Sequence, residues 1–347
     1  MHMADALLAP AVAATMYVAS GTAAGVSIKK LKLDDDTKKL PVMGVMAALV
    51  FAGQMINYTI PGTGSSGHLC GGMMLSALLG PYAGFLSMIV VLAIQCLFFA
   101  DGGLMALGAN VWNMAFYGCF VGYFLIYRPI MKAKWGSTRT RLIVSSVLGC
   151  VLTLQLGALS VCVETAASGI TELPFGAFLA LMQPIHLAIG LVEGLITSAV
   201  LVFVYESRPE LLQVVGGQET AAGRLSRRGV VIVLAYAALL VGGFLSHFAS
   251  GNPDGLEWAL FGNQESGYSA NMGLDEEEFG VSSAVADTAG SVQEKTSFLP
   301  DYAFASDSEN PAGTTVSGIV GSAIVALAAI GVCMAGGFFR RRRVQTQ

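Results

Sequence analysis

The sequence predicts an all-α integral membrane protein, and three observations support this class. Hydrophobic residues make up 54% of the 347 positions and charged residues only 12%, whereas an average soluble domain is about one quarter charged. The mean hydropathy is +0.65. Several apolar runs reach the roughly 20 residues that a helix needs to cross the hydrocarbon core of a membrane. Helical spans are therefore the expected building blocks.

Short polar gaps separate the apolar runs and so define the candidate spans. The runs lie near residues 7 to 28, 41 to 60, 72 to 98, 104 to 127, 142 to 165, 178 to 205, 230 to 248 and 316 to 338. No Lys or Arg precedes the first run, which continues to about Ile28. We therefore expect no cleaved signal peptide and expect Met1 to be retained.

The basic residues gather in four gaps, which fixes the orientation of the spans. These clusters are Lys29, Lys30, Lys32, Lys38 and Lys39; Arg128, Lys132, Lys134, Arg139 and Arg141; Arg208, Arg224, Arg227 and Arg228; and Arg340 to Arg343. The positive-inside rule places all four in the cytoplasm. An odd number of crossings must then separate the gap at 61–71 from the gap at 128–141. Splitting the run 72–98 at Gly80-Pro81 satisfies this condition.

The resulting topology has nine spans, with the N-terminus outside and the C-terminus in the cytoplasm. A re-entrant segment in place of the short third span would satisfy the charge pattern equally well. The one long polar stretch, 249–315, lies outside and carries twelve acidic residues against the single Lys295. It is interpreted either as a solvated loop or as an acidic surface that concentrates divalent cations.

Histidine is scarce, and the topology places all four histidines outside or in the outer half of a span. The α-amine of Met1, the peptide nitrogen of His2 and its imidazole Nδ1 can chelate one metal ion. His68, flanked by the glycine-rich segment 62–67, can supply a fourth nitrogen. Square-planar nitrogen coordination favours Ni²⁺ or Cu²⁺. The alternatives are that His2 is an interfacial residue and that His68 is an ordinary loop histidine.

Four polar residues in the spans are candidates for supporting roles. His186 and Glu193 lie seven residues apart and share one helix face. An ionisable residue near mid-membrane is costly unless paired, so Glu193 either couples transport or pairs helices. Asn110 and Asn113 can bond across helices or hold a liganding histidine.

Soft ligands near His68 offer an alternative metal, and the chain lacks one common nucleotide-binding motif. Met73 and Met74 lie close to Cys70 and His68, and thioether and thiolate ligands suit Cu⁺, although methionine is also a common filler of apolar helices. The sequence contains no GxxxxGK[ST] phosphate loop. If ATP drives transport, another subunit must bind it.

Several of these segments together resemble the CbiM/NikM family, the substrate-capture components of energy-coupling factor transporters for cobalt and nickel. The segments are Met1 to Leu7, Gly67 to Gly72, Gly108 to Met114 and His186 to Gly194. The resemblance covers about residues 1 to 210 and implies a seven-helix S-component bundle. It implies that the metal is held by the amine of Met1, the amide and imidazole of His2, and His68.

The remainder of the chain resembles a PDGLE accessory domain of the NikN type. Asn252 to Trp258 carries the signature and Leu299 to Tyr302 looks like the second segment of that domain. We therefore expect a capture domain at 1–210, a cytoplasmic linker at 211–229 and a two-helix accessory domain at 230–347. Within the accessory domain, 249–315 is expected to be the external loop and 340–347 the basic cytoplasmic tail.

The expected function is metal capture without enzymatic activity, with Ni²⁺ as the transported substrate. Co²⁺ uptake for cobalamin synthesis is the main alternative, and an ion-coupled permease or a membrane metal sensor are others. Family resemblance implies a CbiQ/NikQ-type transmembrane coupling subunit and CbiO/NikO-type ATPases as partners, and no nucleic acid. The expected location is the cytoplasmic membrane of a bacterium or archaeon.

Overall fold

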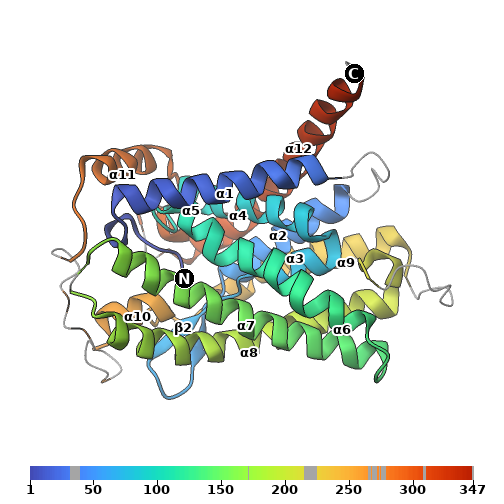
Figure 1. The fold of residues 1–347 in the computed structure, drawn as a ribbon, viewed down its shortest axis with the longest axis horizontal. Coiled ribbons are helices and arrows are strands. Elements are labelled where there is room, and N and C mark those ends of the chain that lie inside the picture. The colour runs from blue at the N-terminus through green and yellow to red at the C-terminus, as the bar shows by residue number, and fades with distance from the viewer. Residues whose placement is uncertain are drawn as a thin grey trace.

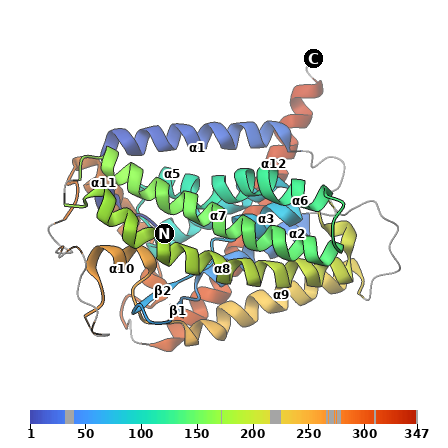
Figure 2. The ribbon, with the colours of Figure 1, turned by 60° about the horizontal axis from the view of Figure 1, so that its bottom comes forward.

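The fold is a bundle of long helices, seen in a computed structural model (Figure 1). The structure describes residues 1–31, 40–170, 172–214, 225–264, 267, 272, 274, 279–307 and 310–345. The axes of most long helices are roughly parallel, and Figure 2 shows α10, α11 and the strands at the end of the bundle opposite α6. The predicted acidic run 275–278 and much of the predicted linker fall outside the described residues.

The first part of the chain forms helices in the order that the apolar runs predict. They are α1 (Pro10–Lys30), α2 (Leu40–Gln54), α3 (Gly72–Leu79), α4 (Pro81–Phe99), α5 (Leu107–Asn110), the π-helix η3 (Val111–Tyr127), α6 (Arg128–Lys132), α7 (Thr138–Ala167) and α8 (Phe175–Ser207). Short 3₁₀ turns precede α1 and follow α8, namely η1 (Asp5–Leu7) and η4 (Pro209–Leu211).

The second part contains two long helices with a folded segment between them. The long helices are α9 (Arg227–Gly243) and α12 (Pro311–Gln345). Between them lie η5 (Leu245–Phe248), α10 (Gly255–Phe261), α11 (Ala284–Thr296) and η6 (Pro300–Tyr302). The region predicted to be one solvated loop is therefore partly helical in its described residues.

Six helices among the described residues are long and apolar enough to cross a membrane, fewer than the nine predicted spans. The six are Pro10–Lys30, Pro81–Phe99, Leu107–Lys132, Thr138–Ala167, Phe175–Ser207 and Ala312–Val332. The other three predicted spans are present as shorter helices, of which α3 has only eight residues. At 1.5 Å per residue, α3 is about 12 Å long and cannot cross a membrane alone.

The short helix α3 continues an extended segment that is itself buried. Residues 65 to 79 are all buried, and the main chain between β2 and α3 is bonded to neighbouring helices. At the other end of α3, the Gln213 side chain donates to the carbonyl of Leu78, 3.0 Å away. Non-helical backbone is tolerated at membrane depth where protein surrounds it. Helix α3 thus covers the residues that the break at Gly80-Pro81 assigns to the short third span, and buried non-helical backbone precedes it.

Close helix contacts hold the bundle together. In α8, Gly190 and Gly194 are four residues apart and face α7. A Cβ at these positions would lie 2.8 and 2.6 Å from the Cα atoms of Val151 and Val147. This small-xxx-small spacing lets two helix backbones approach closely in a membrane protein. Glu193, between the two glycines, is thereby held at a fixed position in the bundle.

The two long helices of the second part pack against the first part. Helices α9 and α12 both contact α2, and α12 also contacts α4. Gly318 of α12 meets Gly242 of α9 so closely that a Cβ at 318 would overlap the carbonyl oxygen of Gly242. These contacts position the segment between α9 and α12 over one end of the bundle.

Candidate metal site

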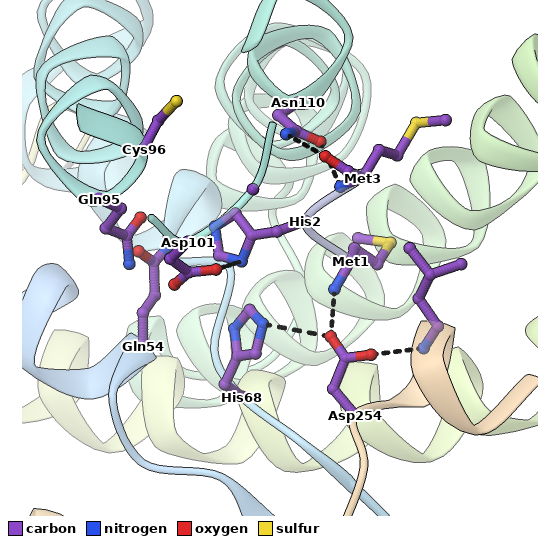
Figure 3. Close-up of polar contacts among 12 residues, drawn as sticks. Met1, His2, Met3, Gln54, His68, Gln95, Cys96, Asp101, Asn110 and Asp254 are labelled. Carbon is purple, nitrogen blue, oxygen red and sulfur yellow. Dashed lines mark hydrogen bonds and ion pairs between the residues drawn. The ribbon is translucent and has the colours of Figure 1, made fainter. Parts of the chain in front are cut away.

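The first residues of the chain enter the bundle and are fixed there by main-chain hydrogen bonds. Met1 is 5% exposed and Met3 is fully buried. Asn110 accepts from the amide nitrogen of Met3 at 2.7 Å and donates to the carbonyl of Met3 at 3.2 Å. Figure 3 shows this pair of bonds beside His2 and Met1. The predicted support role of Asn110 is thus to hold the backbone directly after His2.

The N-terminal amine lies beside a carboxylate from the second part of the chain. Its nitrogen is 3.1 Å from Oδ2 of Asp254, and the same oxygen is 4.0 Å from Nε2 of His68. Burial opposes a charge on the amine, but the Asp254 carboxylate and other nearby anions outweigh it and raise the pKa of the amine. Burial opposes the Asp254 charge too, yet the amine and His68 hold the pKa of Asp254 well below its usual value.

His2 lies next to His68 but is bonded to a different carboxylate. The two imidazole rings stack with their centroids 5.2 Å apart. Nδ1 of His2 is 3.0 Å from Oδ1 of Asp101, which follows α4. The hydroxyl of Tyr302, in η6, donates to Oδ2 of the same Asp101. Chelation through Nδ1 of His2, as the sequence predicts, therefore requires its bond to Asp101 to break.

Hydrogen bonds to helices fix the segment that carries His68. The two carboxylate oxygens of Glu193 accept from the amide nitrogens of Cys70 and Gly71 at 2.8 and 2.9 Å. The side chain of Gln54 donates to the carbonyl of Cys70 at 2.7 Å. Nδ1 of His68 lies 2.9 Å from the carbonyl of Leu69. A carbonyl only accepts, so Nδ1 carries the proton and Nε2 presents a lone pair.

A small hairpin replaces the flexible glycine-rich loop that the sequence suggests before His68. Strands β1 (Tyr58–Ile60) and β2 (Ser65–Gly67) pair antiparallel. On its other side, the amide nitrogen of Ser66 donates to the carbonyl of Pro253 at 2.8 Å. Extended backbone at 252–254 therefore pairs with β2 and brings Asp254 to His68.

Asp254 also starts helix α10. Its Oδ1 accepts from the amide nitrogens of Leu256 and Glu257 at 2.7 and 2.9 Å, and the Glu257 side chain accepts from the amide nitrogen of Asp254 at 3.0 Å. This capping box fixes the carboxylate. One oxygen of Asp254 is thus used for the helix, while the other faces the amine and His68.

The remaining predicted residues divide between the site and its surroundings. His186 lines the same small cavity as Met1, His68 and Asp254. The side-chain nitrogen of Asn113 donates to Oε2 of Glu164 at 2.8 Å, so this asparagine bonds across helices.

Two other residues considered from the sequence lie apart from these contacts. His247 bonds to Thr315 on α12. The sulfur of Met73 packs beside Gly122 and Gly149 in the helix core. Three of the four histidines, His2, His68 and His186, therefore gather at the candidate site.

The arrangement can hold a small cation with main-chain and imidazole nitrogens. The cavity has a volume of about 10 Å³, which is room for one water-sized particle. Within the described ranges, no three His, Cys, Asp or Glu side chains are grouped as metal ligands. The predicted donor set needs only His2 and His68 from these types, because the others are main-chain nitrogens.

Sequence reasoning missed the two carboxylates at the site. In the sequence, Asp254 stands out only as part of the segment that resembles a PDGLE domain. Asp101 has one usable signal, since it is an aspartate at the end of an apolar run and is followed by Gly102 and Gly103. Tyr302 likewise belongs to a segment that was singled out for its family likeness alone.

Fold and site together define an integral membrane protein with a buried, polar, ion-sized site at one end of its bundle. The family CbiM, described as the cobalt uptake substrate-specific transmembrane region, matches residues 2–211. The PDGLE domain matches residues 228–336. The chain belongs to the CbiM family and carries a PDGLE domain in the same polypeptide.

Similar proteins extend over nearly the whole chain. A protein of Archaeoglobus fulgidus assigned to the fused nickel transport proteins NikMN is 34% identical over 94% of this chain and 95% of its own. The fused nickel transport protein NikMN of Rhodobacter capsulatus is 31% identical, covering 96% of each chain. The cobalt transport protein CbiM of Geobacter sulfurreducens is 29% identical over 69% of this chain and 70% of its own.

A solved structure is also similar. The crystal structure of a transition metal transporter superposes with a TM-score of 0.53 at 30% identity, covering 62% of this chain and 96% of the other. With the family matches, it identifies the chain as a multi-pass membrane component of metal transport rather than an enzyme.

Proposed function

We propose that the chain captures Ni²⁺ as the substrate-binding subunit of an importer. The ligands are the amine of Met1, the peptide nitrogen and Nδ1 of His2, and Nε2 of His68. The observation that carries this proposal is the meeting of the buried amine and the lone pair of His68 at one carboxylate oxygen of Asp254. A cation entering this cavity takes the place of the proton that the amine shares with Asp254 and accepts the lone pair of His68.

The site must rearrange locally before the four nitrogens can surround one ion. The main-chain bonds of Met3 to Asn110 keep residue 3 fixed, so the movement is confined to residues 1 and 2. Rotation of the His2 ring takes Nδ1 from Asp101 toward its own amide nitrogen. Asp101 and Asp254 then remain nearby as negative charges that balance a divalent cation.

Nickel is favoured over cobalt by the chemistry of the donor set. An amine, a deprotonated amide and two imidazoles impose a planar arrangement, which suits Ni²⁺. Two fused nickel transport proteins are similar over nearly their whole lengths. Cobalt remains the second candidate, since the cobalt transport protein of Geobacter sulfurreducens is also similar.

The transport assembly that fits this subunit is of the energy-coupling factor type. It comprises a CbiQ/NikQ-type membrane subunit and CbiO/NikO-type ATPases, in the cytoplasmic membrane of a bacterium or archaeon. Helices α1 and α6 end at Lys30 and Lys132, and these helix ends lie at the end of the bundle opposite α10 and the strands (Figure 2). This supports an orientation with the site and N-terminus outside and the C-terminus in the cytoplasm.

Metal titration of the purified chain tests the ligand set. We expect His2→Ala, His68→Ala and a variant with one residue added before Met1 each to lose Ni²⁺ affinity by at least tenfold. His247→Ala serves as the matched control, because it removes a histidine that bonds only outside the site. Wild-type affinity in all three site variants would refute the ligand set.

Uptake by reconstituted vesicles tests the assembly. We expect ⁶³Ni²⁺ accumulation that requires both partner types and hydrolysable ATP. Accumulation by the chain without ATPase subunits, abolished by a protonophore, would instead identify an ion-coupled permease.

A further inference from the structure

Two basic side chains of α6 lie beside a hollow and have no carboxylate close to them. Helix α6 is at the end of the bundle opposite α10 (Figure 2). Three arginines near other helix ends each lie 3.4 to 3.6 Å from a glutamate carboxylate, namely Arg139, Arg208 and Arg227. Arg128 and Lys132, by contrast, are exposed and form no ion pair with any residue that the structure describes. Their charges are therefore available to an anion from outside the chain.

The hollow beside these two cations has a volume of about 410 Å³ and a partly aromatic wall. Besides Arg128 and Lys132, it is lined by Tyr82, Tyr123, Phe124 and Gln213. The ammonium of Lys30 lies 5.4 Å from the centre of the Tyr82 ring, a distance at which a cation is attracted to the face of an aromatic ring. A third cation is thus close to the hollow. Its volume equals that of about a dozen water molecules, which is enough for a phosphate group and its ester substituent.

A row of aromatic side chains leads away from the hollow along η3. The row has one member at every fourth residue, namely Trp112, Phe116, Phe120 and Phe124. The ring centroids of consecutive members are 3.8, 5.3 and 6.4 Å apart. All four are half-buried, and Leu125 next to the last of them is 71% exposed. Because η3 belongs to a helix long and apolar enough to cross a membrane, this row is an apolar surface within reach of the lipid hydrocarbon.

We propose that the hollow binds an anionic phospholipid, with its phosphate group between Arg128 and Lys132 and one acyl chain along the aromatic row. A phospholipid joins an anionic group to a long apolar chain, and the protein places a basic hollow directly at the end of an apolar row. Basic pockets between membrane helices bind anionic headgroups, and tyrosines are enriched at the depth of the headgroups. The attraction is stronger beside apolar groups than in water, because the local dielectric constant is lower.

This lipid site is separate from the candidate metal site, which lies at the other end of the bundle. The bound lipid would contact the start of α4, the end of η3 and helix α6 at once. A ligand that binds only the folded chain stabilises it. Anionic phospholipid should therefore raise the melting temperature of the detergent-purified protein, while leaving its affinity for Ni²⁺ unchanged.

Native mass spectrometry of the delipidated full-length chain measures the binding. The probes are dioleoyl phosphatidylglycerol, which is anionic, and dioleoyl phosphatidylcholine, which has the same acyl chains and no net charge. The double variant Arg128→Gln with Lys132→Gln removes both charges at the hollow. The matched control is Arg139→Gln with Arg227→Gln, which removes two charges that already have carboxylate partners. Inorganic phosphate and glycerol phosphate are added as competitors without acyl chains.

We expect wild type to bind phosphatidylglycerol about 25-fold more tightly than phosphatidylcholine, since each basic side chain near an anionic headgroup contributes roughly fivefold. The Arg128 and Lys132 double variant should bind the two lipids equally, and the control should keep the wild-type preference within about threefold. Wild-type Ni²⁺ affinity in the double variant shows that the chain is folded.

Two results would overturn the proposal directly: equal binding of the two lipids by wild type, or an undiminished preference in the double variant. Displacement of phosphatidylglycerol by an equimolar amount of either chain-free competitor would identify a site for free phosphate compounds and overturn the lipid assignment. If the double variant kept the lipid preference but no longer supported ATP-dependent uptake with partner subunits, the hollow would be a protein contact instead.

Discussion

Replacing Glu193 by glutamine tests whether this carboxylate positions the His68 segment. Glutamine keeps one acceptor oxygen but turns its NH₂ group toward the second amide nitrogen, so one of the bonds to Cys70 and Gly71 is lost. A buried N–H left without a partner costs about 1–3 kcal/mol. The segment can relieve this cost only by moving, which displaces His68.

The expected magnitude follows from that cost. If metal binding must return the segment to its position, about 1–3 kcal/mol raises the Kd for Ni²⁺ roughly 5- to 150-fold. Dye-competition titration of the purified variant measures the change. Glu164→Gln is the matched control, because glutamine can still accept the single bond that Asn113 donates, and its Kd should stay within about threefold of wild type.

A well-folded Glu193→Gln chain with wild-type Ni²⁺ affinity would refute the positioning role. If that variant also lost proton dependence in an uptake assay, Glu193 would instead act as a proton carrier. The same pair of measurements thus separates the two interpretations that the sequence left open.

Three further predictions concern the charge, the packing and the protonation of the site. Asp254→Asn keeps the cap of α10 but removes the charge beside the amine, so we expect the free energy of unfolding of the metal-free chain to fall by about 3 kcal/mol. Asp254→Ala also removes the cap and should lower it by about 1 kcal/mol more. Equal thermal denaturation profiles for wild type and both variants would contradict this. Gly255→Ala places a Cβ 2.6 Å from Cγ2 of Ile185, which should cost about 1–3 kcal/mol, whereas Gly251→Ala, with nothing within 4 Å, should leave the melting temperature unchanged. Because the pKa of the Met1 amine is raised, a proton competes with the metal for this nitrogen. Burial and the nearby amine and His2 lower the pKa of His68 to about 4, so that imidazole stays unprotonated. Ni²⁺ affinity should therefore fall at least about tenfold per pH unit from pH 8 to pH 5, and an affinity that does not change with pH in isothermal titration would count against the amine as a ligand.

Sequence patterns were sufficient for the order of the helices and for the break at Gly80-Pro81. Hydropathy reports where a helix can lie in lipid, and proline at the start of α4 ends the preceding helix. The same break predicted a short third span, and α3 is short. The burial of the non-helical backbone before α3 was not predictable, because residues 65–71 are rich in Ser and Gly and were assigned to an external gap. Hydrogen bonds that Glu193 and Gln54 make to this segment, from distant parts of the chain, hold it in the bundle.

The candidate site was predictable where its chemistry is local. Met1 and His2 are adjacent, so a shared chelate can be recognised without a fold. Asp101 and Asp254 join the site through loops and through strand pairing with Ser66, contacts that no periodicity encodes. The glycine-rich flank of His68 suggested flexibility, yet its glycines shape a hairpin whose edge receives the second part of the chain.

The ion pair between Met1 and Asp254 joins residues 253 positions apart. The candidate site therefore depends on both parts of a single polypeptide. Within one chain, the effective concentration of each partner for the other is set by the connecting segment and not by expression level. Cutting the chain between residues 214 and 225 would turn the contact into a bimolecular one governed by mass action. Because both parts belong to one polypeptide, every copy of the bundle in the membrane has its own Asp254 carboxylate.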